Sequence, residues 1–198
     1  MSFHRIAIKL PFERGVKINP SAIVPVFHRW IRERVPIEGM PIDVADYTHV
    51  HHGPAAILVA HEADYTIDLS DGVAGFTYTR KRPVEAELRE DLIESLRRLL
   101  TAASALAEDP SPHGPVQYDT QSLRVAVLDK LRVPNTAETF ERLKGEVERA
   151  FADAAPDTTA AIDRADDDAR QPLGFAVTLS PAPTINELID RLREAAAA

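Results

Sequence analysis

Apolar residues in the first part of the chain recur first with the period of a strand and then with that of a helix. Ile6, Ile8 and Leu10 occupy alternate positions within residues 3–12, which predicts a strand with one buried face. Residues 19–36 place apolar side chains three and four positions apart, which predicts an amphipathic helix. Its apolar stripe consists of Val26, Phe27, Trp30 and Ile31.

Four short segments rich in β-branched and aromatic residues come next and predict a β-meander. They are residues 42–50, 55–62, 64–69 and 73–80. The Asp-Gly dipeptide at 71–72, between the last two segments, is typical of a two-residue type I′ turn. A turn centred there would set Ile67 opposite Phe76. It would also set Tyr65 opposite Tyr78, which makes a second matched pair across the strands.

Residues 83–110 form the clearest amphipathic helix of the sequence. One apolar seam runs along it and contains Leu88, Leu92, Leu96, Leu99, Ala103 and Leu106. This spacing suits burial in the core of the same chain, which is the favoured interpretation, and it also suits a helix of a second copy. With an open sheet edge as a further contact surface, we expect a homodimer.

The last third of the sequence repeats a hairpin followed by a helix. The order is a hairpin over 116–131, a helix over 134–154, a hairpin around an acidic loop over 158–180, and a helix over 184–198. Asn135 with Glu138, and Thr184 with Glu187, have the spacing of a capping box. Together the patterns predict a single α+β domain over residues 1–198, with a mostly antiparallel sheet and helices packed on one face.

Composition excludes several classes of site. The chain has 198 residues and no cysteine, which removes disulfides, thiolate metal sites and cysteine nucleophiles. The formal net charge of -8 argues against duplex nucleic acid as a partner. Charged residues interrupt the apolar positions near the N-terminus, so no signal peptide is predicted. No apolar run approaches the ~20 residues that span a bilayer, and we expect a cytoplasmic protein without a membrane segment.

The charge is unevenly distributed along the chain. Residues 35–79 contain seven acidic residues, four histidines, and no lysine or arginine. Within this segment the stretch "ADYTHVHHGP", residues 45–54, holds three histidines. It is compatible with a metal site, with an acid–base site, or with a strand end followed by an exposed turn.

A three-histidine metal site fails on strand geometry. His49 and His51 are two positions apart and would point to one face of a strand. His61 is the obvious third ligand. A turn centred on 52–53 sets His61 opposite position 44, about 16 Å along the strand from His49. Metal ligands must converge within about 2 Å of one point, so we expect no metal and no cofactor.

Acid–base chemistry has an incomplete set of residues. In the same register Asp46 and His61 lie diagonally on one face of the hairpin, where a carboxylate would orient an imidazole. The sequence offers no nucleophile motif to accompany them, although Thr48 shares that face. A polar pair that joins two strands is the alternative. Whether the protein is an enzyme is left open by the sequence.

Three other features of the sequence are candidates for binding sites. The eight glycines are scattered and form no phosphate-binding loop. The basic stretch "TRKRP", residues 79–83, would either hold an anion near the start of the long helix or lie at a solvated strand end. The acidic stretch "DRADDDAR", residues 163–170, lacks the glycine and the closing glutamate of an EF-hand, so a solvated loop is expected.

The phrases "IVPVFHRWI", "IDVADYTHV", "GPAAILVAHEADYTIDL" and "DKLRVPNTAETF" give the chain a resemblance to an uncharacterised bacterial family of similar length. The resemblance covers about residues 20–190 and implies no activity. The family commonly has Asp-Gly-Pro where this chain has "HHGP" at 51–54, and Ile-Asn-Asp where it has "VLD" at 127–129. The first departure puts His51 and His52 in doubt as shared chemical groups.

The sequence therefore predicts a non-enzymatic binding or assembly protein that forms a homodimer. The alternative is a metal-binding protein or hydrolase that uses the Asp/His-rich meander, residues 43–68. The ligand-binding candidates are Asp43, Asp46, Tyr47, His49, His61, Glu62, Tyr65 and Asp68. The sequence identifies neither a small ligand nor a protein partner.

Overall fold

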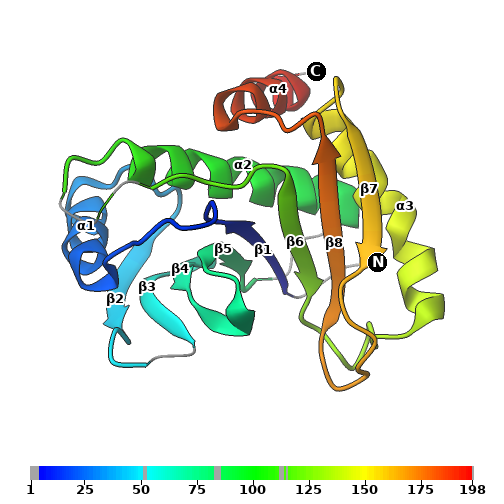
Figure 1. Cartoon of the computed structure of the whole chain (residues 1–198), viewed down its shortest axis with the longest axis horizontal. Coiled ribbons are helices and arrows are strands. Elements are labelled where there is room, and N and C mark those ends of the chain that lie inside the picture. Colours follow the sequence, from blue (N-terminus) through cyan, green and yellow to red (C-terminus); the bar gives the residue numbers. More distant parts are fainter. Residues whose placement is uncertain (1–4, 51–52, 83–85, 112–113, 115, 198) are drawn as a thin grey trace.

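The structure is a computed structural model that describes residues 5–50, 53–82, 86–111, 114 and 116–197, without the side chains of Asp71 and residues 195–197. Its strands form one eight-stranded antiparallel sheet in the order β2-β3-β4-β5-β1-β6-β8-β7 within this described part of the chain. Helices pack against the sheet (Figure 1). The prediction of an α+β fold with a mostly antiparallel sheet is confirmed.

The strand β1 lies in the middle of the sheet although it is the first in the chain. It pairs with β5 on one side and with β6 on the other. The strands are β1 (Ile6–Pro11), β2 (Pro41–Asp46), β3 (Pro54–Ala60), β4 (Ala63–Asp68), β5 (Gly75–Arg80), β6 (Ser122–Val127), β7 (Thr159–Arg164) and β8 (Leu173–Ser180). The β-meander therefore supplies one half of the sheet, and the β6–β8–β7 group supplies the other.

The register of the β4–β5 hairpin agrees with the sequence prediction. Ile67 lies opposite Phe76, and Tyr65 lies opposite Tyr78. The predicted two-residue type I′ turn is wrong, however. The ladder ends at the pair formed by Asp68 and Gly75, and a 3-10 turn, η1 (Ser70–Gly72), lies between them. The matched side-chain pairs thus fix the register without a tight turn.

Four helices are present in the described residues. The first three pack on one face of the sheet, and the fourth packs on the second and third helices. The helices are α1 (Pro20–Glu33), α2 (Leu88–Ala107), α3 (Ala137–Ala154) and α4 (Ile185–Ala197). Figure 1 shows α2 and α3 behind β6, β8 and β7, so the face of these strands that is turned to the viewer carries no helix. We call this uncovered side the helix-free face. None of the helices is long and apolar enough to cross a membrane, as far as the chain is described.

The helix starts follow from side chains that cap free backbone amides. The side chain of Asn19 accepts a hydrogen bond from the amide of Ser21 at the start of α1. Thr184 and Glu187 form the predicted capping box of α4. The predicted box of Asn135 and Glu138 is wrong, because the cap of α3 is Thr136. The side chain of Asn135 is buried and holds the β7–β8 loop instead.

The seam of α2 is fully used by the core of the chain. All six seam residues are buried, and they belong to one hydrophobic cluster with the helix-facing side chains of the sheet. The favoured interpretation of this seam is therefore confirmed. The predicted hairpin over 116–131 is wrong, because this segment contains only the strand β6 and an isolated bridge from Tyr118 to Phe12.

Candidate functional site

The residues singled out in the meander lie at opposite ends of β3. Asp46 is the last residue of β2, and Tyr47 and His49 follow it, next to the start of β3. The amide of His61 donates to the carbonyl of Met40, so His61 lies opposite position 40 and not opposite position 44. The expected register of this hairpin is corrected by four residues.

This register also separates Asp46 from His61. Asp46 pairs with Ala56, which is five residues before His61 on β3. Five residues of strand correspond to about 16 Å, so the expected diagonal contact between Asp46 and His61 is wrong. His51 and His52 lie outside the described residues.

The exposed end of the hairpin is organised by local hydrogen bonds. The Asp46 carboxylate accepts from the amide of Thr48 at 2.9 Å and from its hydroxyl at 2.7 Å. These bonds hold the pKa of Asp46 below its ordinary value. The rings of Tyr47 and His49 contact each other with centroids 6.3 Å apart. Asp43 accepts from the amide of Val44 at 2.8 Å. These contacts account for the polar residues as parts of a turn and an edge strand.

The other end of the hairpin is equally local. Glu62 accepts from the amide of Met40 at 3.2 Å, beside Gly39, whose φ of +92° suits glycine. Burial favours a higher pKa for Glu62, but the amide bond and nearby cations outweigh it and lower the pKa. His61 lines a small hollow of about 390 Å³ with Arg5, Lys81 and Arg82 among its neighbours.

Tyr65 and Asp68 lie on opposite faces of β4. Tyr65 is buried on the helix side, where its ring contacts Tyr78 edge-on at 5.2 Å, and burial raises its pKa. Asp68 lies on the helix-free face. The eight candidates therefore do not converge, and the described residues contain no group of three or more histidines and carboxylates that could hold a metal ion. The meander gives the metal-binding or hydrolase alternative no geometric support.

The two charged stretches are also tied into the structure. From "TRKRP", Arg80 pairs with Asp91 inside the molecule, and Lys81 pairs with Asp64 at 2.7 Å. In the acidic loop, Asp168 pairs with Arg170 at 2.7 Å. The side chain of Asn135 donates to two carbonyls of this loop, each at 3.0 Å. The acidic stretch presents no collected charged site in the described structure, whereas Lys81 and Arg82 of the basic stretch share a hollow with Arg5 and His61.

The helix-free face carries a different polar feature in the middle of the sheet. Thr66, Thr77, Lys9 and Arg124 lie in one row across β4, β5, β1 and β6, each directly opposite the next. Ala176 on β8 continues this row. Two cations therefore occupy facing positions on adjacent strands. Like charges in such positions repel each other, so this arrangement requires a compensating group.

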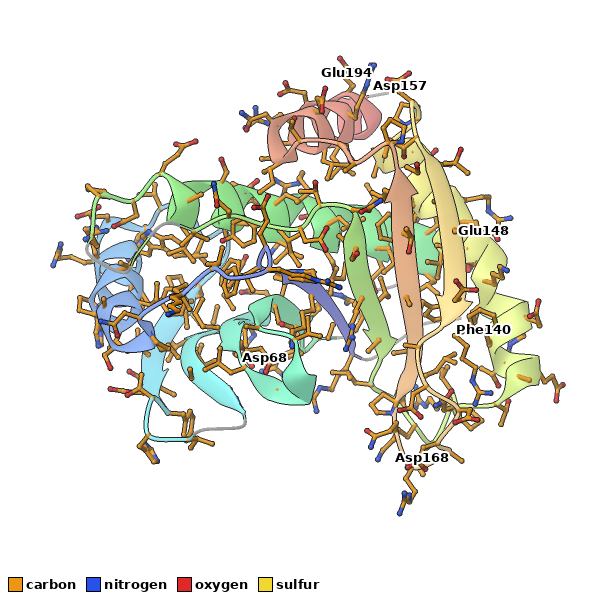
Figure 2. The ribbon with its side chains drawn as sticks, in the orientation of Figure 1. Asp68, Phe140, Glu148, Asp157, Asp168 and Glu194 are labelled. Carbon is orange, nitrogen blue, oxygen red and sulfur yellow. The ribbon has the colours of Figure 1, made fainter. Side chains whose placement is uncertain are left out.

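Lys9 is compensated by the protein itself. Its side chain is almost completely buried, and its Nζ donates to Asp68 at 2.9 Å and to the carbonyl of Ser70 at 3.3 Å. Burial favours a higher pKa for Asp68. Hydrogen bonds from the Ser70 hydroxyl, Lys9 and the Ser70 amide outweigh that effect and lower the pKa. Figure 2 labels Asp68 on the β4–β5 hairpin. The charge of Asp68 is thus committed to Lys9.

Arg124 has no such partner. Its side chain is exposed on the helix-free face, and none of the described residues forms an ion pair or a side-chain hydrogen bond with it. Arg124 also lines two neighbouring hollows, of about 590 and 620 Å³. It therefore supplies the uncompensated positive charge of the row.

The smaller of these hollows contains the polar row. We call it the central trough, and its floor is formed by Ala7, Lys9, Thr77, Thr79, Arg124 and Ala126. The hydroxyl oxygen of Thr77 is buried and has no hydrogen-bond partner in the described structure. The volume of the central trough, about 590 Å³, lies within the range of small-molecule sites. The trough combines an unpaired cation, Arg124, with enough space for a ligand.

Sequence reasoning found only Asp68 among these groups. The sequence signal for the trough is a charged residue among the apolar residues of a central strand. It occurs as Lys9 in "AIKLP" and as Arg124 in "SLRVAV". This signal is weak on its own, because an alternating strand normally exposes polar residues to water on its outer face. Only the strand order places Lys9 beside Arg124, since β1 and β6 are more than 100 residues apart in the chain.

Comparison with known proteins gives no family for the chain. No protein-family model matches it, and none of the curated proteins searched matches it. The resemblance to an uncharacterised bacterial family therefore stays a prediction, and the functional argument rests on the trough.

Proposed function

We propose that this chain is a non-enzymatic binding protein, and that the central trough binds a small molecule with an anionic group. The observation that carries the proposal is the pair of facing cations, Lys9 and Arg124, of which Lys9 alone forms an ion pair within the described structure, with Asp68. A cytoplasmic location is part of the same proposal.

The electrostatics favour an anion at one position. Adjacent strands are about 4.8 Å apart, so a ligand group above Lys9 lies within reach of both Thr77 and Arg124. Asp68 balances Lys9, and the bound anion would balance Arg124. The guanidinium would offer two parallel donors to a carboxylate or phosphate.

The trough supports binding better than catalysis. The trough has two hydroxyl side chains in the described structure, those of Thr77 and Thr79, and no hydrogen bond joins either of them to a base. The lowered pKa of Asp68 and its bonds to Lys9 and Ser70 make it a weak base. These observations support a binding role.

Isothermal titration with acetate and with inorganic phosphate tests the proposal. We expect Arg124→Met to weaken binding of the preferred anion at least about tenfold, and Arg124→Lys to weaken it less, because a charge remains. Arg142→Met, at an exposed position on α3, is the matched control and should bind as the unchanged protein does. Equal binding by Arg124→Met, or no binding of either anion, would contradict the proposal.

A second proposal concerns assembly, and it rests on the difference between the two edges of the sheet. The β2 edge has a proline, a register shift after Pro41, and the Asp43 side chain on the amide of Val44. These are features that block strand addition. The β7 ladder is regular from Thr159 to Arg164. We propose that two copies pair through β7 and form a homodimer.

The backbone of β7 suits such a contact. The amide of Ala165 donates to Gly174 on β8, so the amides of Ala160 and Ile162 point away from β8. No hydrogen bond from the described residues reaches them. In a two-fold pairing centred on Ala161, Asp163 faces Thr159 of the second copy, so no like charges meet.

Light scattering after size exclusion, over a range of protein concentrations, measures this association. Ala160→Pro removes an outward amide without breaking the ladder to β8, so we expect it to give a monomer. Val44→Pro makes the equivalent change on β2 and should leave the dimer intact. Circular dichroism confirms folding of both variants. A monomeric unchanged protein, or a dimeric Ala160→Pro variant, would contradict assembly through β7.

A further inference from the structure

The central trough changes character over a short distance along the strands. The row formed by Thr77, Lys9 and Arg124 is polar. The next row of the same face, two residues further along each strand, contains Thr79, Ala7, Ala126 and Gly174. One step of two residues is about 6.6 Å. A ligand that lies along the strands therefore meets a charged end and an apolar end.

Two further apolar side chains, Leu128 and Pro172, line the trough beyond Ala126. The polar residues Asp166 and Gln171 line it as well. Small side chains on the floor leave the room that a ligand body needs, since alanine and glycine extend little above the sheet. Leu128 is four residues after Arg124, which corresponds to about 13 Å of strand.

The carboxylates of the trough limit the charge of the ligand. Asp68 and Asp166 both line it. Asp68 is balanced by Lys9, so a single negative charge placed at Arg124 is compensated, whereas a second one would be repelled by Asp166. A monoanion therefore fits the trough better than a phosphate ester with two charges.

We infer that the ligand of the central trough is an amphipathic monocarboxylate. Its carboxylate contacts Arg124, and its apolar body covers Ala7 and Ala126 in the direction of Leu128 and Pro172. This inference rests on the proposed function, because it names the ligand class of the same site. It makes the trough selective for ligand length as well as for charge.

Titration of a series of straight-chain carboxylates tests the inference. The probes are acetate, butyrate, hexanoate and octanoate, with 1-octanol as the probe without a charge. We expect the dissociation constant to fall about fourfold for each methylene that becomes buried. Arg124→Met should weaken the binding of every acid, and 1-octanol should bind much more weakly than octanoate.

A second variant separates the apolar part from the charged part. Ala126→Leu fills the floor of the trough and should weaken octanoate at least about tenfold while it leaves acetate unchanged. Ala152→Leu, on the exposed surface of α3, is the matched control and should change neither. Octanoate binding that is insensitive to both Ala126→Leu and Arg124→Met would place the acid elsewhere and overturn the inference.

Different results would contradict the proposed anion site and the inferred ligand class. If Arg124→Met abolishes the binding of acetate or phosphate but chain length has no effect, the anion site stands and the amphipathic ligand class is wrong. If neither the carboxylates nor phosphate bind, both proposals are wrong.

Discussion

Arg80 on β5 and Asp91 on α2 form an ion pair inside the molecule. Their side chains are 6% and 3% exposed, and Arg80 also donates to the carbonyl of Arg82. The pair ties the covered face of the sheet to the longest helix. Burial lowers the pKa of Arg80, which expresses the cost of taking its charge out of water.

Removing one member of this pair should destabilise the protein strongly. Asp91→Ala leaves a buried guanidinium without a counter-charge, and we expect the free energy of unfolding to fall by about 3–5 kcal/mol. In the double variant Arg80→Met/Asp91→Leu both charges are absent, so most of this loss should be recovered. Urea unfolding followed by circular dichroism measures both variants.

A surface ion pair provides the comparison. Asp153 pairs with Arg89 at 2.6 Å, and both side chains are about one-third exposed or more. Asp153→Ala should therefore cost less than about 1 kcal/mol. Equal losses for Asp91→Ala and Asp153→Ala would show that the Arg80–Asp91 pair is not effectively buried.

Tyr118 gives a prediction of the opposite sign. Its ring packs on Phe12 with centroids 5.5 Å apart, and its hydroxyl is buried without a partner in the described structure. Burial also raises its pKa. Because an unsatisfied buried hydroxyl is unfavourable, Tyr118→Phe should leave the stability unchanged or increase it by up to about 1 kcal/mol. A loss above 1 kcal/mol in urea unfolding would reveal a hydrogen bond to this hydroxyl.

The features that could be predicted from the sequence are those that depend on residues close together in the chain. The α2 seam, the register of Tyr65 with Tyr78, and the Thr184 capping box all follow from periodicity or local spacing. Each depends on residues that are close in the chain, or on a hairpin whose two strands are adjacent. Such features can be predicted from the sequence without knowledge of the strand order.

Features that depend on distant segments could not be obtained in this way. Asn135 has the spacing of a helix cap, but the β7–β8 loop offers it two carbonyls, and Thr136 becomes the cap. The trough has the same origin. Lys9 and Arg124 become neighbours only because β1 inserts between β5 and β6. His49 and His61 belong to a histidine-rich segment of the sequence, but the register of the β2–β3 hairpin places them at opposite ends of it.

The α2 seam allows a direct test of its role in the core. Leu96 is buried within the hydrophobic cluster of the chain. Leu96→Ala should lower the free energy of unfolding by about 2–5 kcal/mol. The loss should be independent of protein concentration, because the seam is buried in one chain. Leu131→Ala, at a position that is 98% exposed, should change the stability by less than about 0.5 kcal/mol. A loss that grew with dilution would assign the seam to a subunit interface.

Asp68 should make the stability depend on acidic pH. Its pKa in the folded protein lies below the ordinary value of 3.8, because the bonds from Ser70 and Lys9 outweigh burial. A lowered carboxyl pKa stabilises the folded state above the ordinary pKa, and this contribution is lost as the pH falls through the folded-state pKa. Asp68→Asn cannot ionise, so the stability difference from the unchanged protein should be largest near neutral pH and should shrink below the ordinary pKa.

Urea unfolding from neutral pH down to about pH 2 measures this difference. Lys9→Met is the informative second variant, because it removes one stabilising partner of Asp68 and leaves the two hydrogen bonds from Ser70. Its pH dependence should therefore be weaker than that of the unchanged protein but should not vanish. A constant difference between Asp68→Asn and the unchanged protein across this range would show that Asp68 does not compensate Lys9, and the trough would then hold two uncompensated cations.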